Sequence, residues 1–155
     1  MITLTLVRHA KSDWSNPRLT DHDRPLNARG EHNAPMMAGR FVATGVKVQR
    51  IVSSTAVRAR TTAEAFGKAL GMPVEFDEGL YHASAQRLLT TATAVGVPSV
   101  LLVAHDPGLS DLAYELTDGQ ITHMSTCAVA TFTWDCENWE EALFPADSWS
   151  YDTPR

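Results

Sequence analysis

The chain has 155 residues, of which 44% are hydrophobic and 20% are charged, a composition typical of a globular protein with one core. No apolar run approaches the roughly 18 residues of a membrane span, and the two cysteines provide no disulfide framework. The first residues lack a secretory signal pattern. We therefore expect a single domain over residues 1–155, a cytoplasmic location and no membrane partner.

The net charge of −5 conceals an uneven distribution along the chain. Residues 1–60 carry ten Lys and Arg against four acids, whereas residues 61–155 carry three against fourteen. A locally cationic segment in an acidic protein suits a small anion, because a polyanion usually meets a broader basic face. We expect a ligand that carries phosphate or carboxylate, and no nucleic-acid partner.

Strand and helix patterns alternate along the chain up to Trp134. Residues 2–7 alternate between an apolar face and a β-branched face, and residues 100–103 form an unbroken apolar run, as in a central parallel strand. We predict strands over 2–7, 49–53, 73–77, 99–104 and 127–134, and helices over 27–44, 56–70, 84–95 and 108–116. Residues 13–24 should form a long surface loop, and the tail after Trp134 has no clear period. This order indicates a three-layer α/β/α sandwich around a mostly parallel, doubly wound sheet.

Residues capable of phosphate chemistry follow three of the predicted strands. Arg8 and His9 end the first strand, Ser54 and Arg58 follow the second, and His105 ends the strand over 99–104. In open α/β sheets ligands bind outside the carboxyl ends of the strands, so these segments should converge on one site. An arginine can bind a phosphoryl group through two parallel hydrogen bonds, and a neutral imidazole beside it can attack the phosphorus.

Other routes to phosphoryl or acyl chemistry lack their motifs. The chain has no G-x-x-x-x-G-K-[ST] loop, no G-x-G-x-x-G fingerprint and no G-x-S-x-G elbow. Cys127 lies in an apolar strand and Cys136 lies among acids, so neither thiol should be reactive. The six histidines include no H-x₃₋₅-H pair and no HExxH motif, and we expect no metal site. A histidine nucleophile remains.

The other histidines and one acidic cluster are assigned to loops. Asp21-His22-Asp23 has the composition of a metal or aspartyl-nucleophile cluster, but it lies in the predicted loop, which favours a structural role or a place on the rim of a site. His22, His32, His82 and His123 are expected to be surface or loop histidines.

Three segments taken together resemble the histidine phosphatase superfamily, whose fold is phosphoglycerate-mutase-like. They are Leu6–Ala10, Ser53–Glu64 and Val103–Gly108. Within that superfamily the chain resembles the short phosphohistidine phosphatases of the SixA type through Arg8–Ser12, Asp23–Gly30, Leu80-Tyr81 and Ser125–Ala130. The resemblance covers nearly the whole chain up to about Trp134.

The resemblance implies a role for each residue that matches these motifs. It implies that His9 becomes transiently phosphorylated, with Arg8, Arg58 and His105 around the phosphoryl oxygens, and that water then attacks the phosphohistidine. Arg24 matches a further arginine at the pocket edge. The resemblance implies a phosphorylated substrate, no metal and no cofactor.

Neighbouring residues have less defined roles. Lys11 and Ser12 could support substrate binding or simply be solvated. Larger superfamily members carry a glutamate acid in an inserted segment after the second helix, and here Glu78 and Asp77 are candidates for the proton donor by position only.

The missing acid bears on the choice of substrate. An alcohol leaving group needs a proton donor more than an imidazole does, because a ring nitrogen can depart neutral with a pKa near about 6.5. We therefore expect a phosphatase that acts on protein phosphohistidine. A phosphatase of small phosphate esters or sugar phosphates, and a non-catalytic phosphate-binding module, remain as alternatives.

Overall fold

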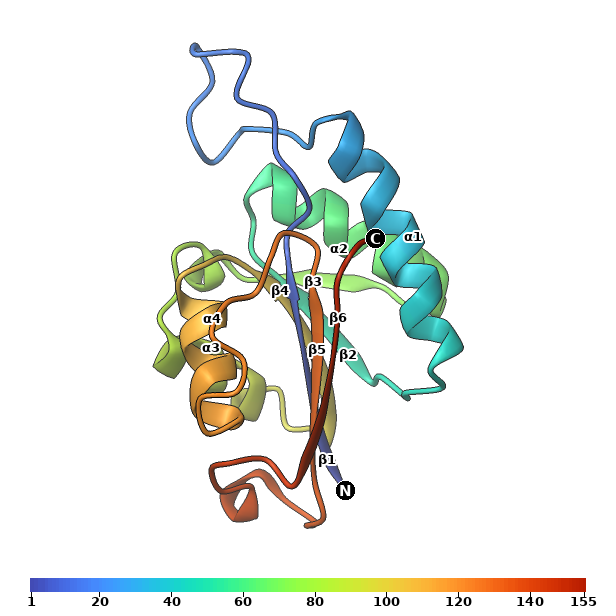
Figure 1. The fold of residues 1–155 in the computed structure, drawn as a ribbon, viewed down its shortest axis with the longest axis vertical. Coiled ribbons are helices and arrows are strands. Elements are labelled where there is room, and N and C mark those ends of the chain that lie inside the picture. The colour runs from blue at the N-terminus through green and yellow to red at the C-terminus, as the bar shows by residue number, and fades with distance from the viewer.

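Six strands form one mixed sheet in the order β3-β2-β4-β1-β5-β6. The computed structural model describes all 155 residues, and Figure 1 shows the sheet seen close to edge-on between two layers of helices. The elements are β1 (Ile2–Arg8), α1 (Ala28–Ala43), β2 (Arg50–Ser53), α2 (Val57–Leu70), β3 (Val74–Phe76), α3 (Ala85–Ala94), β4 (Ser99–Ala104), α4 (Gly108–Leu116), β5 (Val129–Trp134) and β6 (Ser148–Asp152), with two short 3₁₀ helices, η1 (Glu78–Leu80) and η2 (Trp139–Glu141).

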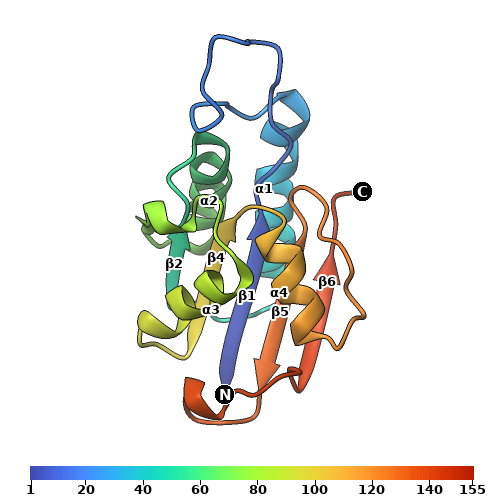
Figure 2. The same cartoon turned by 90° about the vertical axis from the view of Figure 1, so that its left-hand side faces the viewer.

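The parallel part of the sheet brings three strand ends together. β3, β2, β4 and β1 pair in parallel, whereas β5 runs antiparallel to β1 and β6 antiparallel to β5. Figure 2 shows β1, β2 and β4 pointing the same way. Arg8 lies opposite Ala104 and Ser53 lies opposite Val103, so the residues that follow these strands start from neighbouring positions.

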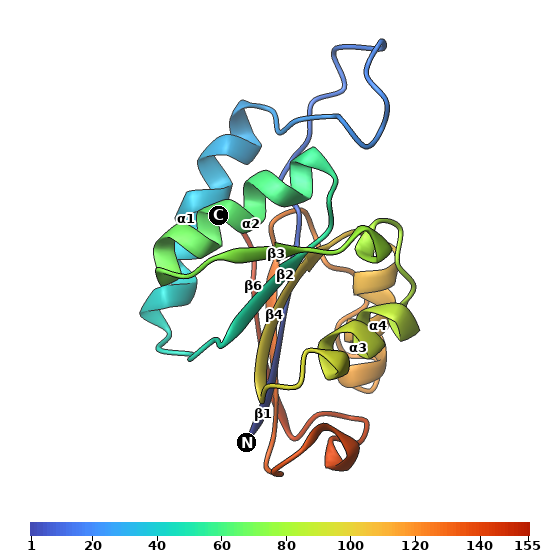
Figure 3. The same ribbon diagram turned by 180° about the vertical axis from the view of Figure 1, so that it is seen from behind.

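Each face of the sheet carries two helices and its own core. α1 and α2 cover one face, and α3 and α4 cover the other (Figure 3). The core under α3 and α4 contains Leu4, Leu6, Leu102, Leu112 and Phe132, and the core under α1 and α2 contains Val7, Met37, Phe66, Leu101 and Val103. Each such side chain contributes about 1.5–3 kcal/mol through burial. The strands β1 and β4 are buried on both faces, as their sequences predicted.

Capping residues define the helix boundaries. The side chain of Asn27 accepts a hydrogen bond from the Gly30 amide at the start of α1, and that of Ser84 accepts one from the Arg87 amide at the start of α3. Gly71 ends α2 with a left-handed backbone at φ 69°. Pro35, which should distort the first helix, lies inside an uninterrupted α1. None of the helices combines the length and the hydropathy that a membrane-spanning segment requires.

The end of the chain differs from the sequence prediction. The predicted strand from Cys127 begins only at Val129, because Cys127 has a left-handed backbone at φ 60° and its amide donates to the carbonyl oxygens of Arg8 and His9. The tail, which showed no clear period, contains an edge strand, β6. Only two apolar side chains, Trp149 and Tyr151, alternate there with small polar ones, so the pattern was too short to recognise.

Candidate active site

A pocket of about 180 Å³ opens where β1, β2 and β4 end. Its lining consists of Arg8, His9, Lys11, Ser12, Trp14, Arg24, Arg58, His82, His105, Asp106 and Thr126. Four nitrogen-bearing side chains that the sequence predicted to meet therefore do meet, and the three weaker candidates for substrate binding line the same pocket. Asp106 is the one carboxylate among the lining residues.

The ring of His9 is fixed in one tautomer by its own loop. Nδ1 lies 2.7 Å from the carbonyl oxygen of Ala10. A carbonyl can only accept, so Nδ1 carries the proton and Nε2 keeps its lone pair. The Ala10 amide donates to Thr62 Oγ1 at 3.0 Å, which ties this loop to α2. A fixed imidazole with a free Nε2 is the form that a nucleophilic histidine needs.

The environment of His9 keeps the ring neutral. The side chain is 7% exposed, and burial lowers its pKa to about 4 even though the hydrogen bond to Ala10 favours the charged form. The positive charges of Arg58, Arg8 and Arg24 contribute to this lowered pKa. The largest contribution to the lowered pKa of His9 comes from desolvation.

The three arginines are held by backbone carbonyls and by two aspartates. Arg8 Nη1 donates to the Met124 carbonyl at 2.9 Å and lies 3.6 Å from Asp106 Oδ2. Arg58, in the first turn of α2, donates to the Asp21 carbonyl at 2.6 Å and to Asp21 Oδ2 at 3.0 Å. The partly bidentate contact fixes the guanidinium plane of Arg58.

Asp21 also binds the third arginine, and so it joins two cations. Arg24 Nη2 donates to Asp21 Oδ1 at 2.8 Å, and Arg24 also donates to the hydroxyl of Ser12. Burial raises the pKa of Asp21, but hydrogen bonds from Tyr81, Arg24 and Arg58 outweigh it and hold that pKa well below its usual range. Asp21 is therefore ionised and has the structural role on the rim that its loop position favoured.

His105 is held by a hydroxyl at the end of β2. Its Nε2 lies 2.8 Å from Ser54 Oγ, and its ring centroid lies 5.1 Å from that of His9. The side chain is 3% exposed, and burial, followed by the neighbouring His9, Arg58 and His82, lowers its pKa to about 2. His105 is therefore neutral in the free protein at ordinary pH.

Every buried side-chain nitrogen or oxygen that lacks a hydrogen-bond partner in this protein belongs to the pocket. The four atoms are Arg8 Nε, Arg24 Nε, Arg58 Nε and His105 Nδ1. An unpartnered buried polar group costs about 1–3 kcal/mol, so such groups are rare and usually serve a ligand. Unpartnered nitrogens on four residues that line one pocket are the arrangement expected of a phosphate site.

The predicted proton donors lie outside this pocket. Glu78 is exposed at the start of η1, and the Asp77 carboxylate accepts a hydrogen bond from the Gly79 amide at 2.8 Å. Neither residue lines the pocket. Both follow β3, whose end lies beyond β2 in the sheet order and hence farthest from β1.

Sequence reasoning missed several residues of the site. Trp14 stacks on Arg24, with the guanidinium carbon 3.5 Å from the ring centroid, and His82 lines the pocket although it is a loop histidine as expected. Asp21 was not recognised as the anchor of two arginines. All three positions depend on how the long loops close, and no periodic pattern reports that closure. Asn27, a residue type typical of helix N-caps, was the one sign in the sequence of where the first loop ends.

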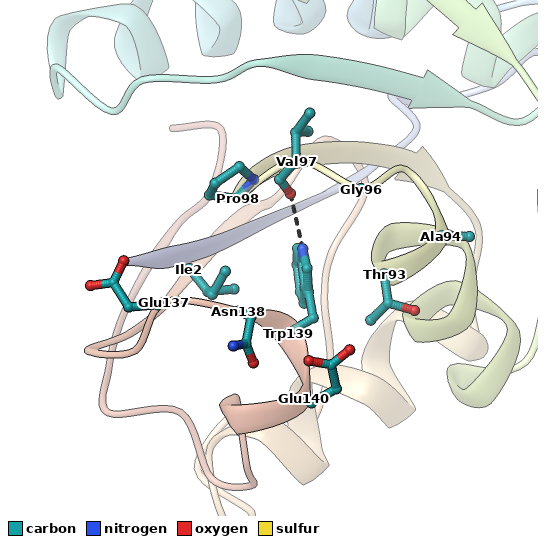
Figure 4. A pocket seen from close by; sticks show the side chains of 10 residues that line it. All are labelled: Ile2, Thr93, Ala94, Gly96, Val97, Pro98, Glu137, Asn138, Trp139 and Glu140. Carbon is teal, nitrogen blue, oxygen red and sulfur yellow. Dashed lines mark hydrogen bonds between the residues drawn. The ribbon is translucent and has the colours of Figure 1, made fainter.

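A larger hollow of about 500 Å³ lies at the opposite end of the sheet, beside the start of β1 (Figure 4). Trp139 in η2 donates to the Val97 carbonyl at 2.9 Å across it. Its charged lining residues, Glu137 and Glu140, are both acids, so it does not suit a phosphate.

No group of three or more His, Cys, Asp or Glu side chains is arranged to hold a metal ion. Burial raises the pKa of Cys127 to about 12, which makes this thiol unreactive.

Comparisons with known proteins agree with this geometry. Residues 4–85 match the model of the histidine phosphatase superfamily (branch 1). The phosphohistidine phosphatase SixA of Escherichia coli K12 is 31% identical over 141 residues, which cover 84% of each chain.

Solved structures share the fold over almost the whole chain. A crystal structure from Agrobacterium tumefaciens, named as a SixA phosphohistidine phosphatase, superimposes with a TM-score of 0.82 at 26% identity and 99% coverage of both chains. A phosphoserine phosphatase from Entamoeba histolytica has a TM-score of 0.69 at 16% identity, covering 100% of this chain and 98% of its own, which is a likeness of fold alone. Fold, family model and relatives thus coincide, and the chain belongs to the histidine phosphatase superfamily as a hydrolase of the short SixA type.

Proposed function

We propose that this protein hydrolyses phosphorylated substrates in two steps through a phosphohistidine at His9. The hydrogen bond from His9 Nδ1 to the Ala10 carbonyl carries the proposal, since it leaves Nε2 free to attack. In the first step Nε2 bonds to phosphorus as the bond to the leaving group breaks. In the second step water attacks the phosphorus, the bond to Nε2 breaks, and inorganic phosphate leaves.

The cations around His9 stabilise the transferring group. The unpartnered nitrogens of Arg8, Arg58 and His105 would donate to the equatorial oxygens, where charge gathers in an in-line transition state. For His105 the Ser54 hydroxyl would donate to Nε2, which leaves the proton on Nδ1, the unpartnered atom. Arg24 would bind an outer oxygen, with Ser12 and Lys11 beside it. Because these groups supply the positive charge, the reaction is proposed to need no metal.

The nucleophile can be identified directly by trapping. A brief reaction with labelled substrate, quenched in alkali because phosphohistidine is acid-labile, should leave label on the peptide that contains His9. His9→Ala should lose both the label and the turnover, and His105→Ala should lower turnover by about 100-fold or more, as for a key oxyanion contact. His32→Ala, a substitution on the exposed surface of α1, is the control. Turnover by His9→Ala near that of the wild type would mean that the covalent route is wrong.

We further propose that the substrate is a phosphohistidine of a protein. The carboxylates nearest the pocket are not free to donate a proton: Asp21 binds two arginines and a tyrosine, and Asp106 accepts from the Ser110 amide and hydroxyl at 3.0 and 2.7 Å. An imidazole leaving group tolerates the lack of a carboxylic acid better than an alcohol does. The likeness to SixA over 84% of both chains supports the same choice.

Turnover compared across substrates decides between this proposal and its alternative. The comparison uses a histidine-phosphorylated protein, phosphoserine peptides and sugar phosphates at matched concentrations. The highest kcat/KM is expected for the phosphohistidine protein. A higher value for a sugar phosphate would replace the proposal with a small-molecule phosphatase, and binding without any turnover would indicate a phosphate-binding module.

A further inference from the structure

One histidine of the pocket has no part in the scheme above. His82 lies in the connection between η1 and α3, and its side chain is 63% exposed although it lines the pocket. Its ring centroid lies 6.1 Å from that of His105, and its Nε2 lies 3.8 Å from Asp21 Oδ2. His82 therefore reaches both the phosphate site and the solvent.

The backbone holds His82 in this position at some cost. Its φ is 59°, in the left-handed region that residues other than glycine rarely adopt, and strain of this kind collects at functional sites. Ala83, the residue after His82, packs closely against the first turn of α4. Its carbonyl oxygen lies so near Gly108 that a Cβ added there would be 2.0 Å from it. The ring of His82 also stacks on Tyr81 with centroids 3.9 Å apart. The connection is thus fixed against the segment that carries His105.

We propose that His82 is the proton donor to the leaving group, a role that rests on the proposed attack by His9. As His9 Nε2 bonds to phosphorus, the bond to the leaving oxygen or nitrogen breaks. The leaving atom keeps the electron pair and takes a proton from the His82 imidazolium, which becomes neutral. Solvent then returns the proton to the exposed ring before the next turnover.

The groups that face His82 suit this role. Asp21 is ionised, and its Oδ2 lies 3.8 Å from His82 Nε2, so a carboxylate faces the ring that would carry the donated proton. The charge of Arg58 is already paired with Asp21, and His105 is neutral at ordinary pH. The Tyr81 hydroxyl donates to Asp21, which excludes it as the donor. His22 meets the Tyr81 ring edge-on with centroids 4.9 Å apart, and its Nε2 lies 2.9 Å from Thr55 Oγ1.

Two substrates of similar size test the proposal through the leaving group. p-Nitrophenyl phosphate releases a stable anion, whereas phenyl phosphate releases a phenolate whose conjugate acid has a pKa of about 10 and therefore needs a proton. His82→Asn suits the left-handed backbone, because asparagine tolerates that region. We expect the variant to lose about 100-fold in kcat/KM on phenyl phosphate and less than about threefold on p-nitrophenyl phosphate.

The pH profile of kcat/KM provides a second test of the role of His82. The dependence of kcat/KM on pH for phenyl phosphate should differ between the wild type and His82→Asn, because an asparagine side chain cannot carry the donated proton. His123→Asn is the matched control, because His123 is also exposed and lies 3.6 Å from a carboxylate, that of Asp106, but does not line the pocket.

Each outcome separates the two proposals. Equal losses on both substrates, no loss on phenyl phosphate, or a wild type that cannot hydrolyse phenyl phosphate would overturn the role of His82. Label trapped on His9 in His82→Asn would leave the proposed two-step reaction standing, and absence of label in the wild type would reject that reaction itself.

Discussion

At the scale of single residues, the reactivity of His9 depends on surroundings that shift its pKa in opposite directions. The Ala10 carbonyl holds the proton on Nδ1, while burial and the arginines oppose a second proton on Nε2. A lowered pKa means that the neutral ring persists as the pH falls below about 6.5, down to about 4. The nucleophile is thus preserved over a range in which a free histidine would be charged.

We expect His9 to titrate near pH 4 in the folded protein and to keep its proton on Nδ1 above that pH. Substrate phosphates gain a proton near pH 6 and would confuse an activity profile, so the ring is better followed by NMR on histidine labelled with ¹⁵N. The chemically unfolded protein provides the reference. Titration of His9 near pH 6.5 with equal population of both tautomers would contradict the assignment.

The residues of the site differ in how far the sequence reveals them. Arg8 ends β1, His9 and His105 directly follow β1 and β4, and Arg58 lies in the first turn of α2. A correct strand pattern therefore already places these four residues at one edge of the sheet. Trp14, Asp21 and His82 lie in loops whose closure depends on contacts between distant segments, such as Tyr81 with Asp21. Local patterns cannot report such contacts. Glu78 was chosen by its position along the chain, but it follows β3, which β2 and β4 separate from β1 in the sheet.

At the scale of elements, the start of α1 is fitted against the segment that leaves β1. A Cβ on Gly30 would lie 2.2 Å from the Lys11 carbonyl oxygen, and the Asn27 amide donates to that same oxygen at 3.0 Å. Ser12 pairs with Leu26 in an isolated bridge. These contacts close the base of the loop over residues 13–24, from which Arg24 and Asp21 reach the pocket.

Two substitutions in α1 should therefore have opposite effects. Gly30→Ala should push the Lys11 segment away, lower stability by about 1–3 kcal/mol and weaken phosphate binding. Gly39→Ala has nothing within 4 Å of the new Cβ and should raise stability by about 0.5–1 kcal/mol without changing phosphate binding. Urea denaturation and phosphate titration measure both effects. Similar behaviour of the two variants would refute the close fit at Gly30.

Among the elements, the buried strands and the capped helices were predictable from the sequence, whereas the edge strand β6 was not. β4 has an unbroken apolar run and matches its predicted range, because a strand that is buried on both faces must be apolar throughout. β6 is exposed along most of its length and pairs only with β5, so burial places little demand on its sequence. Hydrogen bonds to β5, rather than hydrophobicity, define it.

At the scale of the whole molecule, the uneven charge distribution finds its explanation in the pocket. Residues 1–60 carry the excess of positive charge, and they supply Arg8, Lys11, Arg24 and Arg58 to the lining. Among the acidic later residues, Asp106 is the one carboxylate in the lining, beside His82, His105 and Thr126. A small anion would thus meet concentrated positive charge at one end of a protein whose net charge is −5. The division of charge along the sequence therefore predicted which part of the chain supplies the cations of the pocket.

The stacking of Trp14 on Arg24 makes the pocket optically observable. Trp14 is 73% exposed and lies against a pocket arginine, whereas the other three tryptophans belong to β5, η2 and β6. Binding of orthophosphate should draw the guanidinium toward the anion and change the fluorescence of Trp14 without any added dye. Titration with phosphate should give a saturable change in emission that Trp14→Phe abolishes and that Trp149→Phe retains. A change in emission that persists in Trp14→Phe would mean that the signal arises from another residue. A change that is lost in Trp14→Phe and kept in Trp149→Phe would give this enzyme a stopped-flow readout of each phosphoryl group that arrives and leaves.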